Sequence, residues 1–431
     1  MYQPLLLTHI RMLLDGESPP PYLLMLVFAV RRCALWGFQA CFSCVIPLKN
    51  DKKKCWFCFF TIFAPQKRAE AMKYCFIIPV YNRPLEVAEL LASLSKQTCR
   101  DFDVHIVEDG SEVTCREVCD HHSNRLDIHY YMKENGGPGA ARNYGAERAT
   151  GDYFIVLDSD VVLPPDYLTS IDEELSQNPC DAFGGPDRAH PDFTPVQKAI
   201  SYSMTSFFTT GGIRGGKKKL DRFYPRSFNM GVSRELWQQL GGFRAMRFGE
   251  DIDFSYRICE AGARCRLFPE AWVWHKRRTD FRKFFRQVRN SGVARINLHL
   301  LHPGSMKLVH LLPAAFTIGI LTLAVVFLTG LLFALLGLLA SSHEGCNMSP
   351  VVILFGVALM ALALLPLLLY ALLIFVDSSI RNRSLWVGLL SVPASFIQLI
   401  GYGTGFLTAA WQRLVLKRKD EGFDSNKLLY K

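Results

Sequence analysis

Two aspartates that follow an apolar run are the strongest candidates for metal binding in this chain. Asp158 and Asp160 stand two residues apart, directly after residues 153–157. Carboxylate oxygens at this spacing suit Mg²⁺ or Mn²⁺ bridging a diphosphate. A solvated turn is the alternative, because Asp favours turns. We favour the metal site because a predicted strand precedes the motif and other polar motifs fall in register with it.

Two further motifs have the residue types of a nucleotide site. Glu108 and Asp109 end a second apolar run and are followed by Gly-Ser. Their carboxylates are predicted to bind a base or ribose, unless they only close a turn. The glycine-rich residues 135–139 lead into a predicted helix that carries Arg142, which favours a nucleotide contact over a plain loop.

Two motifs nearer the C-terminus suggest acid–base and phosphate chemistry. Glu250 and Asp251 follow a glycine at the start of a predicted helix. A carboxylate there can cap the helix, or it can act as a general base held ionised by the helix end. His275 follows a short predicted strand and is either a packed polar residue or a metal or phosphate ligand. Arg277 and Arg278 are either diphosphate or acceptor contacts or membrane-proximal charge.

Alternating strands and helices are predicted to position these motifs. The predicted strands are residues 74–80, 104–108, 128–132 and 153–157, and the predicted helices are residues 85–95 and 140–149. Such alternation is typical of an α/β fold with a mostly parallel sheet. Ligands bind outside the carboxyl ends of the strands in such sheets. Pro79 and Tyr81, at the end of the first strand, are therefore expected beside the carboxylate motifs.

The charge of the chain is divided between an acidic middle and basic ends. Residues 72–275 carry 23 Lys and Arg against 29 Asp and Glu, whereas residues 276–431 carry 17 against 6. Half of the 431 residues are hydrophobic, which excludes a disordered chain. Because the basic residues lie beside apolar runs, a membrane is the expected partner and nucleic acid is not.

Three apolar runs predict about three transmembrane helices. Residues 308–340, 350–376 and 385–411 contain no Asp, Glu, Lys or Arg, and each exceeds the roughly 20 residues that cross a bilayer. The positive-inside rule places the catalytic region in the cytoplasm of a multi-pass protein of the cell (inner) membrane. Three crossings would leave the basic tail outside. Either the third run does not fully cross, or the rule fails there.

These patterns divide the chain into five segments. Residues 1–71 form a poorly defined leader, expected not to be part of the native protein, although a fourth membrane segment over residues 21–48 is the alternative. Residues 72–280 form the catalytic domain. Residues 281–307 form an amphipathic interfacial helix and linker, because Phe281, Phe284, Phe285 and Val288 recur at helical spacing among basic residues. Residues 308–411 form the transmembrane region, and residues 412–431 a basic tail.

Residues 73–275 resemble a family 2 glycosyltransferase with the GT-A fold. The resemblance rests on motifs in a fixed order: Ile77-Ile78-Pro79-Val80-Tyr81-Asn82, Val107-Glu108-Asp109-Gly110-Ser111, Gly139-Ala140-Ala141-Arg142-Asn143-Tyr144-Gly145, Leu157-Asp158-Ser159-Asp160, Phe228-Asn229-Met230-Gly231, and Gly241-Gly242-Phe243 leading to Gly249-Glu250-Asp251.

The resemblance implies a nucleotide-diphosphate sugar as donor, a divalent metal (Mg²⁺ or Mn²⁺) and inversion at the anomeric carbon. By position, it makes Asp160 the principal metal ligand and Asp158 a ligand of ribose or metal. It makes Asp251 the base, and we give Glu250 a supporting role. Glu108 stands where the family usually has Asp, a departure that bears on the nucleotide contacts.

The sequence thus predicts a membrane-bound inverting glycosyltransferase that acts on a lipid or lipid-linked acceptor at the cytoplasmic face. A processive polysaccharide synthase is one alternative, disfavoured because Gln287-Val288-Arg289-Asn290 departs from the Q-x-x-R-W signature of such synthases. A sugar nucleotidyltransferase is another, and a non-catalytic membrane scaffold is a third. The intact carboxylate motifs argue against the scaffold.

Overall fold

The computed structural model describes residues 72–190, 192–211, 223–246, 248–276, 279–341 and 349–417. The leader, with the expectation attached to it, lies outside the described residues, as do Arg277, Arg278 and most of the basic tail. The chain divides into two units, Met1–Met72 and Lys73–Lys431, and all that follows concerns the second.

A seven-stranded, mostly parallel sheet forms the centre of the catalytic domain. Its strand order is β3-β2-β1-β4-β8-β6-β9. The strands β3, β2, β1 and β4 are parallel to their neighbours, whereas β8 runs antiparallel to both β4 and β6. The bounds are β1 Tyr74–Val80, β2 Phe102–Asp109, β3 Asp127–Lys133, β4 Tyr153–Leu157, β6 Ala182–Gly184, β8 Asn229–Ser233 and β9 Cys265–Leu267.

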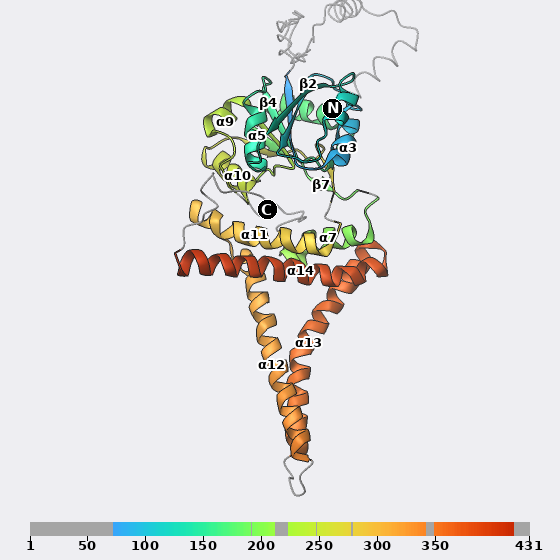
Figure 1. The fold of residues 1–431 in the computed structure, drawn as a ribbon, viewed down its shortest axis with the longest axis vertical. Helices are drawn as coiled ribbons and strands as arrows, with labels where there is room; N and C mark the ends of the chain where they lie inside the picture. The colour runs from blue at the N-terminus through green and yellow to red at the C-terminus, as the bar shows by residue number, and fades with distance from the viewer. Residues whose placement is uncertain are drawn as a thin grey trace, which may run out of the picture. The chain divides into compact units, whose positions relative to one another are not determined.

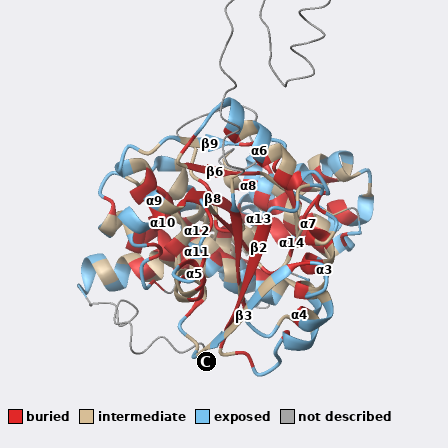
Figure 2. Ribbon diagram, turned by 90° about the horizontal axis from the view of Figure 1, so that it is seen from above, coloured by how far each residue is buried: buried red, intermediate tan, exposed pale blue. Residues whose placement is uncertain are grey.

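The helices of the domain follow the strands, as the alternating pattern predicts. They are α3 Pro84–Leu94, α4 Arg116–His122, α5 Pro138–Ala146, α6 Tyr167–Gln177, α7 Pro195–Thr205, α8 Phe207–Thr210, α9 Arg234–Leu240 and α10 Glu250–Glu260. Proline begins α3 and α5, because its missing N–H and fixed φ suit the first turn of a helix. Buried residues concentrate on the sheet and on the helix faces turned toward it (Figure 2). The expected α/β fold is confirmed.

A second, three-stranded sheet lies at the carboxyl ends of the main strands. It consists of β5 Val161–Val162, β7 Asp187–Arg188 and β10 Val273–His275, in the order β5-β10-β7. The register pairs His275 with Val161, the residue after Asp160. This small sheet therefore carries His275, more than a hundred residues away in sequence, to the carboxylate motif.

Two helices pack closely beneath the catalytic domain, and we call this pair the platform. They are α11 Phe281–Leu301 and α14 Leu385–Ala410. Glycines allow the close approach: a side chain at Gly292 would meet the carbonyl oxygen of Tyr402 at 2.1 Å, and one at Gly405 would meet that of Arg289 at 2.0 Å. Helix α11 begins at Phe281, where the sequence places its interfacial helix.

In the described part of the chain, three helices are long and apolar enough to cross a membrane, as expected: Leu308–Ser341, Pro350–Asn382 and Leu385–Val415. They correspond to α12 Leu312–Ser341, α13 Ser349–Asn382 and α14. Helices α12 and α13 approach each other closely where Gly330 faces Gly356. Figure 1 shows this pair extending away from the sheet, with α14 running across its near end alongside α11.

The contacts of α14 explain this crosswise course. Gly388, near its start, lies against Ser379 at the end of α13, whereas Gly403 lies against Thr317 at the start of α12. These two glycines are about 22 Å apart along a helix. Helix α14 therefore connects the near ends of α12 and α13 rather than running along either of them.

The catalytic domain is tied to the platform by a buried charge cluster. Asp253, fully buried on α10, accepts hydrogen bonds from Arg257 at 2.9 Å and Arg244 at 3.0 Å, and its Oδ1 lies 2.9 Å from Nε2 of His302. His302 caps the C-terminal end of α11, and its Nδ1 lies 2.7 Å from Glu260. The helix that begins with Glu250 and Asp251 is thereby held to α11.

Candidate active site

The structure brings the three expected metal ligands together at the carboxyl end of β4. Asp158, Asp160 and His275 each offer one ligand atom, and these atoms lie within 4.8 Å of one another. His275 Nε2 is 3.2 Å from Asp160 Oδ1. The ring of Phe228 stacks on the imidazole at 5.1 Å and fixes its plane. Two carboxylates and one imidazole form a donor set that fits a divalent cation such as Mn²⁺.

An arginine absent from the sequence prediction completes this cluster. Arg83, which precedes α3, donates from a terminal nitrogen to Asp160 Oδ2 at 2.6 Å. Burial alone would raise the pKa of Asp160, but the hydrogen bond and charge of His275 and the charge of Arg83 outweigh it and hold the pKa well below its usual range. Asp160 is therefore a carboxylate at neutral pH, the form that binds a metal ion.

The acidic motif after β2 organises loops. Glu108 is fully buried; its Oε1 accepts from the backbone N–H of Cys115 at 2.6 Å, and it also accepts from the Ser111 hydroxyl. Asp109 accepts from the backbone N–H groups of Gly136 and Gly137 at 2.9 and 2.7 Å. Both carboxylates thus shape the loops around the predicted nucleotide site, and a ligand contact by either would add to or displace these bonds.

The first strand ends beside the same loops. Pro79 is half-buried within β1, and Tyr81, just beyond it, is exposed. Asn82, at a left-handed φ of 53°, accepts from the backbone N–H groups of Glu112 and Val113. The end of β1 is therefore tied to the loop after β2, and Tyr81 is the expected nucleotide contact that stands most open to solvent.

Arg142 connects the metal motif, Asp158 and Asp160, to the base motif, Glu250 and Asp251. Its guanidinium, buried in the middle of α5, donates to Asp158 at 2.8 Å and to Glu250 at 3.1 Å. The sequence predicts a nucleotide contact for Arg142. In the structure its partners are two protein carboxylates, which connect the two motifs, and the nucleotide contact stays a prediction.

Glu250 and Asp251 start α10 in different environments. The Glu250 side chain is 11 % exposed and the Asp251 side chain 22 % exposed. Burial raises the pKa of Glu250 to about 7, since desolvation and the charge of Asp251 outweigh the attraction of Arg142. Asp251 pairs with Arg226, whose terminal nitrogen is 3.3 Å from Oδ2. Arg226 is a second arginine that the sequence prediction missed.

A cavity of about 540 Å³ connects the base motif to the membrane helices. Its walls come from the base loop, which we define as Phe248 and Gly249, and from α10, α11, α14 and the start of α12. The wall residues used below are Glu250, Asp251, Arg226, Arg295, Leu312 and Gln398. Asp251 thus lines the same cavity as the first residues of the first apolar helix, Leu312 and Pro313.

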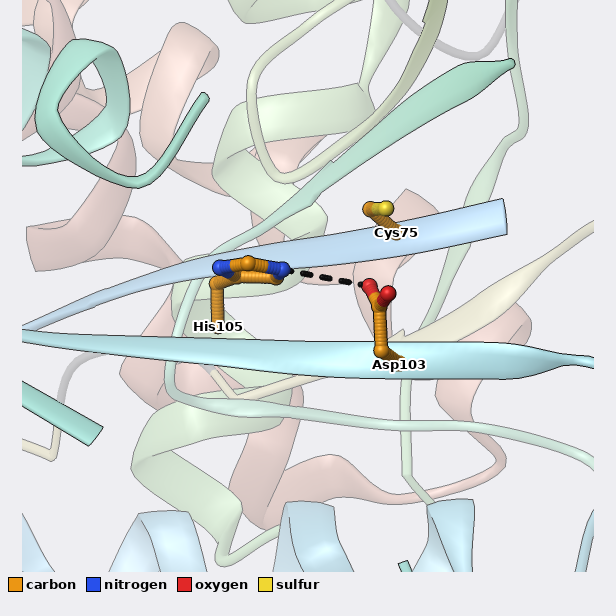
Figure 3. A group of neighbouring side chains, drawn as sticks. All are labelled: Cys75, Asp103 and His105. Atoms are coloured by element: carbon orange, nitrogen blue, oxygen red, sulfur yellow. Dashed lines mark ion pairs between the residues drawn. The ribbon is translucent and has the colours of Figure 1, made fainter. Parts of the chain in front are cut away.

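A separate titratable cluster occupies the opposite ends of the strands. Cys75, Asp103 and His105 lie on β1 and β2 (Figure 3). His105 Nε2 is 3.2 Å from Asp103 Oδ1, and Lys73 Nζ is 3.2 Å from Asp103 Oδ2. Burial opposes ionisation of Asp103, yet hydrogen bonds from His105 and Cys75 lower its pKa to about 2. We interpret this cluster as a buried ion pair that stabilises the sheet.

Comparison with known proteins covers the catalytic domain. Residues 75–240 match the family model described as glycosyl transferase family 2. The chain is 41 % identical over 88 residues to an uncharacterized glycosyltransferase of Rickettsia felis, covering 20 % of this chain and 15 % of that protein. It is 27 % identical over 213 residues to a probable glycosyltransferase of Sulfolobus acidocaldarius, covering 46 % of each. The chain thus spans less than half the length of these relatives.

A solved structure is similar over a longer range. It is a mannosyltransferase from Pyrobaculum calidifontis in complex with GDP-Man and Mn²⁺, with a TM-score of 0.48 and 16 % identity, covering 80 % of this chain and 89 % of that one. The family match rests on residues 75–240, which hold the sheet and the carboxylate motif. Residues 75–240 therefore match a family 2 glycosyltransferase domain, and three helices long enough to cross a membrane follow them among the described residues.

Proposed function

We propose that the protein transfers a sugar from a nucleotide-diphosphate sugar to a lipid or lipid-linked acceptor, with inversion at the anomeric carbon. The cavity carries this proposal. Its wall includes both the base motif, Glu250 and Asp251, and Leu312 in the first turn of α12. An acceptor whose tail lies in the bilayer could place a hydroxyl at Asp251 without leaving the membrane.

The donor site is assigned to the metal motif and the loops around it. Asp158, Asp160 and His275 would hold Mg²⁺ or Mn²⁺, which, when bound, supplies positive charge to the departing diphosphate. Arg83 would add a second positive group there, 2.6 Å from Asp160. Arg142 would keep the donor and base motifs at a fixed separation, because positioning of reactants contributes a large share of catalysis.

Asp251 is assigned as the general base. Its carboxylate takes the proton of the acceptor hydroxyl while that oxygen forms a bond to the anomeric carbon. The bond from that carbon to the diphosphate oxygen breaks on the opposite face, and the nucleoside diphosphate leaves with the electron pair. Arg226, 3.3 Å away, orients the carboxylate. Glu250 is more buried than Asp251 and is assigned a positioning role, because it holds the guanidinium of Arg142.

We also propose that only α12 and α13 cross the bilayer and that α14 lies in its interface. The crosswise course of α14 and its close packing on α11 support this topology. With two crossings, the basic tail stays on the side of the catalytic domain, which satisfies the positive-inside rule. The side is then the cytoplasmic one, at the cell (inner) membrane.

The test is nucleotide release from a panel of sugar nucleotides, measured on the full chain in lipid nanodiscs. We expect one donor to give release that rises when an extract of membrane lipids from the source cells is added, with the sugar appearing in the lipid phase. Release that never depends on lipid, with the sugar found only in water-soluble products, would contradict a lipid acceptor.

A further inference from the structure

Arg295 is a buried guanidinium on α11 in the cavity wall. The residue is 8 % exposed. One terminal nitrogen donates to the hydroxyl of Tyr256 at 3.1 Å, and Nε has no hydrogen-bond partner within the ranges that the structure describes. In the described part of the chain, no carboxylate lies within ion-pairing distance of Arg295. A guanidinium keeps its charge in proteins, and burying it without an anion is costly.

The other charges of the cavity wall already have partners. Arg226 pairs with Asp251 at 3.3 Å, and Glu250 pairs with Arg142 at 3.1 Å. These pairs leave the charge of Arg295 uncompensated. A second wall residue, Gln398 of α14, has a buried Oε1 with no hydrogen-bond partner among the described residues. The wall thus offers an unused cationic donor and an unused neutral acceptor.

We propose that Arg295 binds a phosphoryl group of the acceptor's head group. This inference rests on the proposed function and names the chemical class of its acceptor: a lipid that carries a phosphate beside a hydroxylated group. The phosphoryl oxygens supply the anion that Arg295 lacks, and a planar guanidinium matches them with two parallel hydrogen bonds. A hydroxyl of the same head group donates to Gln398.

The position of Arg295 places this phosphoryl group near the base. The preceding residue, Ala294, approaches the base loop so closely that a side chain at Gly249 would meet its Cβ at 3.2 Å. Tyr256, the partner of Arg295, lies on the same helix as Asp251. An acceptor held by Arg295 therefore presents groups close to its phosphate to Asp251, while its tail extends toward Leu312.

The test compares two lipids that differ only in the phosphate. Dioctanoyl phosphatidic acid and dioctanoylglycerol are titrated onto the full chain in phosphatidylcholine nanodiscs, without donor, and Kd is measured. We expect phosphatidic acid to bind at least tenfold more tightly. Arg295→Gln should remove about ten- to hundredfold of that affinity, the scale of a charge-assisted hydrogen bond. Arg295→Lys should lose less, because it keeps the charge.

Controls separate this site from general electrostatics and from misfolding. Arg286→Gln removes an exposed charge from the same helix and should leave both Kd values unchanged. Tyr256→Phe removes the hydrogen bond to Arg295 but not the charge, and should weaken phosphatidic acid binding only a few-fold. If Arg295→Gln melts far below the wild type, the comparison is made between Arg295→Lys and the wild type.

Three outcomes would overturn the proposal. The first is equal affinity for the two lipids. The second is equal weakening by Arg295→Gln and Arg286→Gln. The third is that inorganic phosphate binds as tightly as phosphatidic acid, which would identify a free-phosphate site. Failure of the proposed function is distinguishable, because the transferred sugar would then appear only in water-soluble products, whatever the two Kd values are.

Discussion

Replacing Glu250 with glutamine should make the protein more stable at alkaline pH. The pKa of this buried carboxyl is raised from 4.5 to about 7, so the folded state binds its proton more tightly than the unfolded chain does. As pH rises from about 4.5 to 7, the folded state must therefore lose stability, and above 7 the loss is complete. Glutamine resembles the protonated side chain and does not carry this penalty.

The magnitude follows from the size of the shift. At about 1.4 kcal/mol per pKa unit, a rise from 4.5 to about 7 corresponds to roughly 3 kcal/mol. The hydrogen bond from Arg142 is already included, because its attraction opposes the rise. We expect Glu250→Gln to exceed the wild type in Tm by several degrees at pH 8, since about 1 kcal/mol shifts Tm by roughly 2–4 °C in a domain of this size.

The assay is thermal unfolding of both proteins in the same detergent from pH 4.5 to 9. The difference in Tm should grow between about pH 4.5 and 7 and then stay constant. Glu147→Gln is the matched control, because Glu147 is 70 % exposed and should give no pH-dependent difference. If the Tm difference between Glu250→Gln and the wild type is the same at pH 5 and pH 8, or has the opposite sign, burial does not raise the pKa of Glu250.

Three more predictions concern the metal site, the platform and the tail. Asp160→Ala should abolish transfer and weaken Mn²⁺-dependent donor binding, measured by calorimetry with and without EDTA; full activity in excess EDTA would refute the metal assignment. Gly405→Leu should lower Tm and transfer together, because the new side chain meets the backbone of Arg289; an unchanged Tm would contradict the tight α11–α14 contact. In sealed vesicles, protease should cleave an epitope added after Lys431 only when it can also reach the catalytic domain. Cleavage of the epitope while the catalytic domain is protected would show that α14 crosses the membrane.

Much of the sheet could be predicted from the sequence. The strands at residues 74–80 and 153–157 were predicted with the bounds of β1 and β4, because each is a short apolar run bounded by polar residues. Both are buried, as central parallel strands must be. The ends of α5 could not be placed as well: the structure ends it at Ala146 rather than residue 149. Glu147, Arg148 and Ala149, which follow the helix, are residues that favour helix. The helix ends there because the backbone N–H groups of Arg148 and Ala149 both donate to the carbonyl oxygen of Gly145.

Other features depend on contacts that sequence patterns do not contain. Arg83 and Arg226 are single basic residues far in sequence from their aspartates, so nothing local marks them as partners. Asp253 received no role from the sequence, yet it is a buried tie between α10 and α11. Hydropathy also gives the length of a helix but not its direction. The glycines of α14 were the one visible signal of its packing against α11.

The central claim is that Asp251 activates the acceptor inside the cavity. The most direct test is single-turnover sugar transfer by Asp251→Asn, with donor binding measured on the same sample and the exposed Asp120→Asn as control. If Asp251 is the general base, Asp251→Asn binds the donor as the wild type does and transfers sugar roughly two to four orders of magnitude more slowly, the usual contribution of a general base. Transfer at nearly the wild-type rate by Asp251→Asn, with normal donor binding, would contradict the account.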